Sequence, residues 1–155
     1  MSIITIRNTV KLGLVLIVLG IATFLIVTNL PHRNVQGSKT DTQITLEQVY
    51  SEYKSDPNAA DEKYLDESGD SNIMEVSGVF VSTNKNLNGQ IILILGSKTE
   101  SVKLRCTLIS DFNEEINNLI QGDNITIKGV IRSGIYYDEA LQRYGDFVFN
   151  DCDIK

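Results

Sequence analysis

Aromatic and basic side chains gather toward the end of the sequence, where they could recognise a ligand by stacking and by charge. Tyr136, Tyr137 and Tyr144 flank one polar loop. Rings placed near cations are typical of surfaces on which bases stack. The predicted ligand-binding residues are Lys103, Arg105, Arg132, Tyr136, Tyr137, Arg143 and Tyr144. The alternative is that these side chains only cover one end of the domain and keep it soluble.

The sequence contains few residues or motifs that are typical of catalytic or metal-binding sites. His32 is the only histidine, and one imidazole makes neither a catalytic triad nor a four-ligand metal site. No GxSxG, HExxH or phosphate-loop motif occurs. The acidic stretch from Asp66 lacks the calcium-loop register, because Ser77 stands where the bidentate Glu is required. We therefore predict a protein that is not an enzyme and that holds no metal or cofactor.

Residues 12–30 (LGLVLIVLGIATFLIVTNL) form an uncharged run of nineteen residues. As a helix this run spans ~28 Å, about the hydrocarbon thickness of a bilayer. Its exit has no small-x-small cleavage pattern, which favours an uncleaved anchor over a cleaved signal peptide. We expect a single-pass protein of the cytoplasmic membrane, with residues 1–11 in the cytoplasm and the remainder on the other side.

Residues 31–155 have the length of one domain and a negative net charge. From Pro31 onward the chain carries 12 basic and 20 acidic residues, a formal charge of −8. This charge disfavours a nucleic-acid backbone as the partner without excluding it. Residues 31–43 are polar and lack apolar periodicity, so we expect a flexible tether there and a folded domain over residues 44–155.

The domain is expected to open with two helices. Thr45 and Gln48 have the spacing of a capping box. Asp56-Pro57 should end this first helix, because the residue before a proline leaves helical geometry. A second helix is expected over residues 58–65. The apolar stripe of the first helix is Leu46, Val49, Tyr50 and Tyr53.

Five strands follow, with one helix among them. We predict strands over residues 73–82, 90–95, 102–108, 124–132 and 146–154, and a helix over residues 111–120. Gly78 and Gly129 interrupt the first and fourth strands and predict sharp bends. In the last strand, Val148, Cys152 and Ile154 should share a face opposite Phe147 and Phe149.

Bent first and fourth strands, with a helix between the third and fourth, predict a mainly β fold: a small five-stranded barrel of the OB type. An SH3-like barrel is the structural alternative, but it does not normally place a helix at that position.

The same segments carry a family resemblance. The motifs are Ala59-Ala60-Asp61 with Lys63-Tyr64, residues 75–79, 102–106 and 122–129, and Asn150-Asp151-Cys152. From Leu46 to Ile154 the chain resembles the bacterial OB-fold group called tRNA_anti-like. The resemblance implies an OB-fold of nucleic-acid ancestry, in a group whose members are often lipoproteins or membrane-anchored. The stretch from Tyr64 to Met74 is longer and more acidic than the usual turn of that group, which argues against phosphate contacts there.

Cys106 and Cys152 would lie on neighbouring strands of such a barrel. A disulfide between them would stabilise the domain if it faces an oxidising compartment. A pair of buried free thiols is the equal alternative.

These observations together predict a membrane-anchored binding module of the bacterial cell envelope. Its partner would be a protein or a glycan that contacts the loops around Tyr136 and Arg105. The alternative is a cytoplasmic domain that binds single-stranded nucleic acid.

Overall fold

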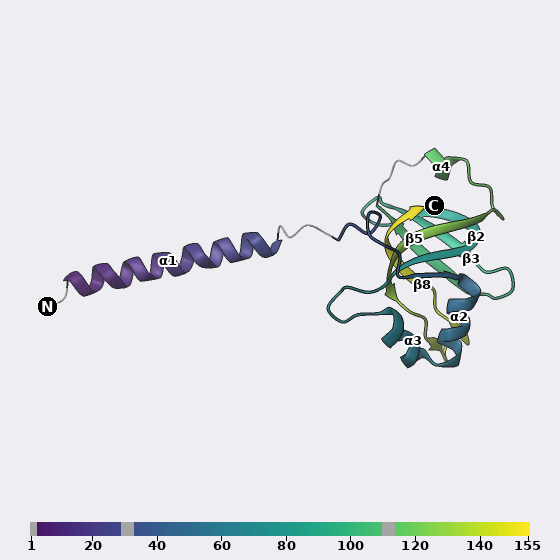
Figure 1. Ribbon diagram of the computed structural model, residues 1–155, viewed down its shortest axis with the longest axis horizontal. Coiled ribbons are helices and arrows are strands. Elements are labelled where there is room, and N and C mark those ends of the chain that lie inside the picture. The colour runs from purple at the N-terminus through teal and green to yellow at the C-terminus, as the bar shows by residue number, and fades with distance from the viewer. Residues whose placement is uncertain (1–2, 29–32, 110–113) are drawn as a thin grey trace. The chain divides into compact units, whose positions relative to one another are not determined.

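The computed structural model describes residues 3–28, 33–109 and 114–155, and the chain divides into two compact units, Met1–Arg33 and Asn34–Lys155 (Figure 1). The first unit contains α1 (Ile3–Thr28), a helix of 26 residues. Its large apolar side chains between Val15 and Leu25 are 52% to 66% exposed where the structure describes them. Within the described part of the chain, no helix meets the combined length and hydropathy needed to cross a bilayer.

The second unit is built around a closed five-stranded barrel. Its strands follow the order β2-β3-β4-β8-β5, and β2 pairs with β5 to close the ring. β4 and β8 are parallel, whereas the other pairs within the barrel are antiparallel. This closed barrel confirms the mainly β, five-stranded prediction. The strands are β2 (Ile73–Lys85), β3 (Ile91–Gly96), β4 (Lys103–Leu108), β5 (Asn124–Ser133) and β8 (Phe147–Ile154).

The bend in β2 is what lets five strands close. Residues 73–79 pair with β5, and residues 79–85 pair with β3, so one strand serves two neighbours. Gly78 pairs in regular register with Ile125, and an added Cβ there would lie 3.2 Å from the carbonyl oxygen of Gly96. The register shift of β2 falls a little later, between Phe80 and Ser82. At Gly129 the register between β5 and β8 shifts, so this glycine marks the irregularity that its position predicts.

The last strand departs from the predicted alternation. Phe147, Phe149 and Cys152 are all buried, whereas Val148 is 37% exposed. Asp151 has φ 54°, and this left-handed residue adds one position to β8 before Cys152. The prediction that Cys152 shares a face with Val148 is therefore wrong, because a bulge resets the period-two pattern.

Two helices close one end of the barrel, after a short strand. β1 (Thr42–Thr45) pairs with β2 in parallel and leads into α2 (Leu46–Ser55), followed by α3 (Pro57–Tyr64). The predicted capping box is present: the Thr45 hydroxyl accepts from the Gln48 backbone N–H, and the Gln48 side chain accepts from the Thr45 N–H. The buried stripe of α2 matches the predicted one: Leu46, Val49, Tyr50 and Tyr53.

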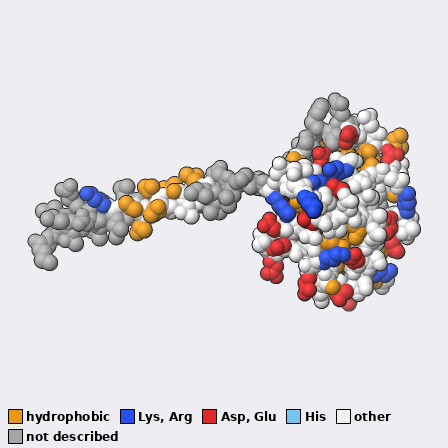
Figure 2. Space-filling model, in the orientation of Figure 1, with side chains coloured by type: hydrophobic (Ala, Val, Ile, Leu, Met, Phe, Trp, Pro, Cys, Tyr) orange, Lys and Arg blue, Asp and Glu red, His pale blue; other side chains and the backbone are white. Residues whose placement is uncertain are grey.

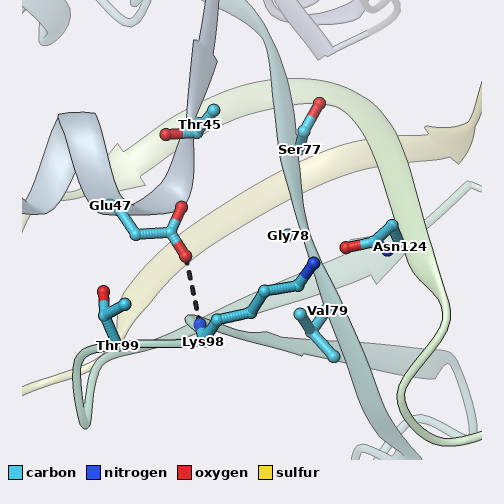
Figure 3. A pocket seen from close by; sticks show the side chains of 8 residues that line it. All are labelled: Thr45, Glu47, Ser77, Gly78, Val79, Lys98, Thr99 and Asn124. Atoms are coloured by element: carbon cyan, nitrogen blue, oxygen red, sulfur yellow. Dashed lines mark hydrogen bonds between the residues drawn. The ribbon is translucent and has the colours of Figure 1, made fainter.

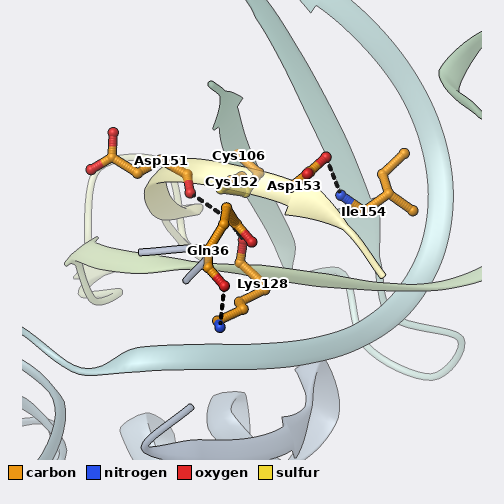
Figure 4. The surroundings of a disulfide bond; sticks show 7 residues. All are labelled: Gln36, Cys106, Lys128, Asp151, Cys152, Asp153 and Ile154. Atoms are coloured by element: carbon orange, nitrogen blue, oxygen red, sulfur yellow. Dashed lines mark hydrogen bonds between the residues drawn. A yellow bond between two sulfur atoms is a disulfide. The ribbon is translucent and has the colours of Figure 1, made fainter. Parts of the chain in front are cut away.

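Most of the expected tether is part of the folded unit. The Gln36 side-chain amide donates to the backbone carbonyls of Lys128 (3.1 Å) and Asp151 (2.8 Å). In return, the Lys128 ammonium donates to the carbonyl of Gln36 at 3.0 Å (Figure 4). It also donates to the carbonyl of Ser38 at 2.5 Å. Residues 34–41, which we call the strap, are therefore bound to β5 and β8. Their polar composition reflects hydrogen bonding to the barrel rather than flexibility.

The helix predicted over residues 111–120 is shorter. α4 covers Glu114–Asn117, and the predicted cap at Asp111 lies outside the described residues. Ile120, placed on the apolar face by the prediction, is 71% exposed. Its N–H donates to the Asp123 carboxylate in the turn before β5, so the chain has already left the helical path there.

The two cysteines are joined in a disulfide that connects β4 to β8 (Figure 4). Their Cα atoms lie 6.0 Å apart, a normal separation for a disulfide. Both residues are buried in the core. The parallel pairing of β4 with β8 is the contact that brings them together.

Candidate binding surface

The predicted tyrosines lie on a two-stranded ribbon between β5 and β8. β6 (Tyr137–Asp138) pairs with β7 (Arg143–Tyr144), and we call residues 136–146 the tyrosine ribbon. The Asp138 carboxylate accepts from the N–H groups of Ala140 and Leu141, which fixes the turn. The sequence predicts a loop over residues 133–145, and within that loop the structure has a short two-stranded hairpin.

A ladder of tyrosine rings connects the ribbon to the core. Tyr137, 52% exposed, meets the ring of Tyr144 at a centroid distance of 5.2 Å. Tyr144 meets Tyr50 of α2 at 5.4 Å, and both contacts are edge-to-face. Such contacts favour one ring arrangement over others. The exposed ring of Tyr137 is therefore held by the half-buried ring of Tyr144, which itself packs on the buried Tyr50.

Tyr136 is tied to α3 instead. Its ring is 55% exposed, while its hydroxyl donates to the Asp61 carboxylate. This hydrogen bond, with partial burial, raises the pKa of Tyr136 above its ordinary value. The hydrogen bond therefore ties the ribbon to α3 through a phenol that ionises less readily than a free one.

Tyr53 lies against the base of the ribbon and is fully buried. Burial raises the pKa of Tyr53, and the nearby Asp61 carboxylate raises it further. Its hydroxyl and the Asp61 Oδ1 atom are buried without a hydrogen-bond partner. An added Cβ on Gly134 would lie 2.1 Å from the Tyr53 ring, so only glycine allows this approach.

An open hollow of about 470 Å³ lies beside these rings. Two phenols and two carboxylates are among its walls. The lining residues are Ser133, Gly134, Tyr136, Tyr137, Asp138, Gly145 and Asp146. We call this the ribbon hollow.

The predicted basic residues are distributed over three elements. Lys103 and Arg105 project from the exposed side of β4, where Arg105 stands between Ile94 of β3 and Val148 of β8. Arg132, at the end of β5, lies 3.9 Å from the Asp151 carboxylate. Only Arg143 belongs to the tyrosine ribbon, opposite Asp138. The structure thus brings the three tyrosines and Arg143 together, and it places the other three cations on strands of the barrel.

A second hollow, of about 340 Å³, lies where α2 begins (Figure 3). The Glu47 carboxylate accepts from the Lys98 backbone N–H at 3.1 Å. Burial alone would raise the pKa of Glu47, but hydrogen bonds from its own backbone, Ser97 and Lys98 outweigh it and lower the pKa. The walls are Thr45, Glu47, Ser77, Gly78, Val79, Lys98, Thr99 and Asn124. The sequence analysis missed this hollow, because its walls come from four separate segments.

Charge on the visible face of the domain is mixed. Figure 2 shows Lys and Arg side chains interspersed with Asp and Glu side chains over that face. Among the residues that the structure describes, no three His, Cys, Asp or Glu side chains gather in a way that could hold a metal ion.

The strand order, the closure of β2 on β5 and the helix between β4 and β5 define an OB-fold domain. The tyrosine ribbon is an insertion between its last two strands. The chain belongs to the tRNA_anti-like family, whose model matches residues 2–144. A comparison with curated proteins gives no match.

Proposed function

We propose that this protein is a non-enzymatic OB-fold module that binds a macromolecular partner through the tyrosine ribbon. The observation that carries the proposal is the pair of exposed rings, Tyr136 and Tyr137, each held by a neighbouring side chain: Tyr136 by the Asp61 carboxylate and Tyr137 by the ring of Tyr144. A ring that is already ordered loses little conformational entropy when a partner covers it. Family membership supports a binding role over a catalytic one.

We further propose that residues 12–30 anchor this module in the bacterial cytoplasmic membrane, with the OB domain outside the cytoplasm. The support is the uncharged run itself and the large apolar side chains that α1 presents from Val15 to Leu25. An extracytoplasmic position would also suit the disulfide, since thiols stay reduced in the cytosol.

The placement can be tested by labelling one engineered cysteine in intact cells. Leu87 is fully exposed at the β2–β3 hairpin, and both native cysteines are bonded, so Leu87→Cys adds one reactive thiol. We expect an impermeant maleimide to label Leu87→Cys but not Ser2→Cys. Labelling of Ser2→Cys alone would indicate the opposite orientation, with the OB domain in the cytoplasm. That result would favour the nucleic-acid alternative.

The binding surface can be tested by photocrosslinking of the full chain in native membranes. A benzoylphenylalanine in place of Tyr137 should form a discrete protein or glycan adduct. The same group in place of Leu87, another exposed apolar residue, is the matched control and should not. Equal adducts at both positions, or none at Tyr137, would overturn the proposed surface. An adduct removed by nuclease would favour the nucleic-acid alternative.

A further inference from the structure

The charge around the tyrosine ribbon differs from what the sequence suggests. Arg143 is the basic residue of the ribbon, and it stands in register with Asp138 on the neighbouring strand. The walls of the ribbon hollow include Asp138 and Asp146, and no Lys or Arg is among the described residues that line it. The exposed rings therefore lie beside negative charge.

The rings themselves add to this preference. The face of an aromatic ring carries negative potential and attracts a cation within about 6 Å of its centroid. The inner end of the same ladder already shows such a contact, with the Lys54 ammonium 5.8 Å from the centre of Tyr50. Tyr136 and Tyr137 offer ring surface of the same kind to solvent.

Asp61 supplies a third carboxylate next to the hollow. It accepts from the hydroxyl of Tyr136, a residue of the hollow wall. Its Oδ1 atom is buried, close enough to Tyr53 to raise the pKa of that phenol. The Tyr53 hydroxyl lies against Gly134 of the same wall.

The hollow also has room for a side chain together with its backbone. Its volume of about 470 Å³ falls within the range of ordinary ligand sites. Gly134 and Gly145 contribute no side chain to the walls, so a peptide backbone can approach there.

We propose that the ribbon hollow binds an arginine or lysine side chain of a protein partner. This inference rests on the proposed function and specifies the chemistry of the partner. Two phenol rings and two carboxylates in one wall match a cation on a flexible stem, whereas a phosphate backbone would meet repulsion from Asp138 and Asp146. A neutral glycan could use the rings but would leave the carboxylates without a counter-charge.

The test is a titration of the full chain in nanodiscs, with ring-¹³C tyrosine observed by NMR. The probes are the peptide acetyl-Gly-Arg-Gly-Arg-Gly-amide and the same peptide with citrulline, a neutral analogue of arginine. We expect the arginine peptide to shift the Tyr136 and Tyr137 signals in a saturable way and to bind at least tenfold more tightly than the citrulline peptide. Equal binding of the two peptides would overturn the proposal, as would shifts produced only by an oligosaccharide of N-acetylglucosamine or by oligothymidine.

Two double variants that each remove two negative charges test whether the arginine peptide binds at the ribbon hollow. Asp138→Asn/Asp146→Asn keeps an acceptor in the turn and should weaken binding of the arginine peptide at least fivefold. Glu67→Gln/Asp70→Asn removes the same charge from an exposed loop and should leave binding unchanged. Equal weakening in both variants would show attraction by net charge alone and would overturn the site.

The two proposals can fail separately. If the crosslink at position 137 forms equally in Asp138→Asn/Asp146→Asn, the ribbon binds a partner but not through a cation. If position 137 forms no adduct and the arginine peptide does not bind, both proposals fail.

Discussion

The disulfide between β4 and β8 should supply a large part of the stability of the domain. Cys106 and Cys152 are separated by 46 positions in the chain. In the chain-entropy description, closing a loop of this length lowers the conformational entropy of the unfolded state, which stabilises the folded state by about 4 kcal/mol. Since small domains are stable by about 5–15 kcal/mol, the reduced protein should unfold at a much lower concentration of denaturant.

The assay compares oxidised and reduced protein of one sequence. The full chain in nanodiscs is equilibrated in urea, and the folded fraction is read by a short pulse of protease. With a urea dependence of about 2 kcal/mol per M, a loss of about 4 kcal/mol lowers the midpoint by about 2 M. The reduced form is prepared by unfolding in reductant and refolding, because the buried bond is protected in the native state.

The control is Cys106→Ala/Cys152→Ala, whose midpoint should not respond to reductant. A difference below about 0.5 M between oxidised and reduced wild type would refute the loop-closure reasoning. The reduced protein, with two packed thiols, would then be about as stable as the protein with the disulfide.

Three further perturbations test other contacts of the barrel. Gly134→Ala should destabilise the domain by about 1–3 kcal/mol, because its Cβ would enter a buried tyrosine ring; Gly145→Ala, whose Cβ meets nothing closer than 4.0 Å, should change the urea midpoint little. Lys128→Met keeps an unbranched side chain, one atom shorter, but not the two hydrogen bonds to the strap, so amide exchange at Ser38 should accelerate by about tenfold or more while exchange in β4 stays slow. Hydrogen bonding, first from a threonine hydroxyl, lowers the pKa of Glu75 in the folded state. The stabilisation from Glu75 is therefore complete above its ordinary pKa and is lost as the pH falls through the lower folded-state value, and wild type should lose more thermal stability than Glu75→Gln between about pH 5 and pH 3.

The barrel could be predicted because each of its elements has a local signal. Alternating residues mark β4, paired glycine interruptions mark the bent strands, and the Thr45–Gln48 spacing marks the start of α2. These signals depend on neighbours within a few residues. The prediction for the last strand failed because the left-handed geometry of Asp151 has no such local signal.

The composition of the binding surface was less predictable. Spacing placed Tyr136, Tyr137 and Tyr144 on one segment, but it could not show that Asp61 of α3 reaches Tyr136. Asp61 does belong to the Ala-Ala-Asp motif that carries the family resemblance, and that motif was the available signal. The cations of β4 were assigned to the same surface from their type alone, since sequence does not say which face of a barrel a distant strand presents.

For a related reason, the sequence predicts a flexible tether where the structure has the hydrogen-bonded strap. Polar residues without periodicity are common to flexible linkers and to segments bound by hydrogen bonds alone. What separates the two is a buried donor elsewhere in the chain, here the ammonium of Lys128. Such a partner, about ninety positions away, leaves no trace in the composition of the strap.

The position of β8 also sets the order in which the molecule can mature. A ribosome makes this strand after every other strand of the barrel, yet β8 fills the gap between β4 and β5 and supplies one of the two thiols. Until it emerges, β4 and β5 each present an open edge, and Cys106 has no native thiol with which to pair. Acquisition of the native barrel must therefore wait until β8 has been synthesised, and a nascent form stalled before Phe147 would be a natural substrate for chaperones and quality-control proteases.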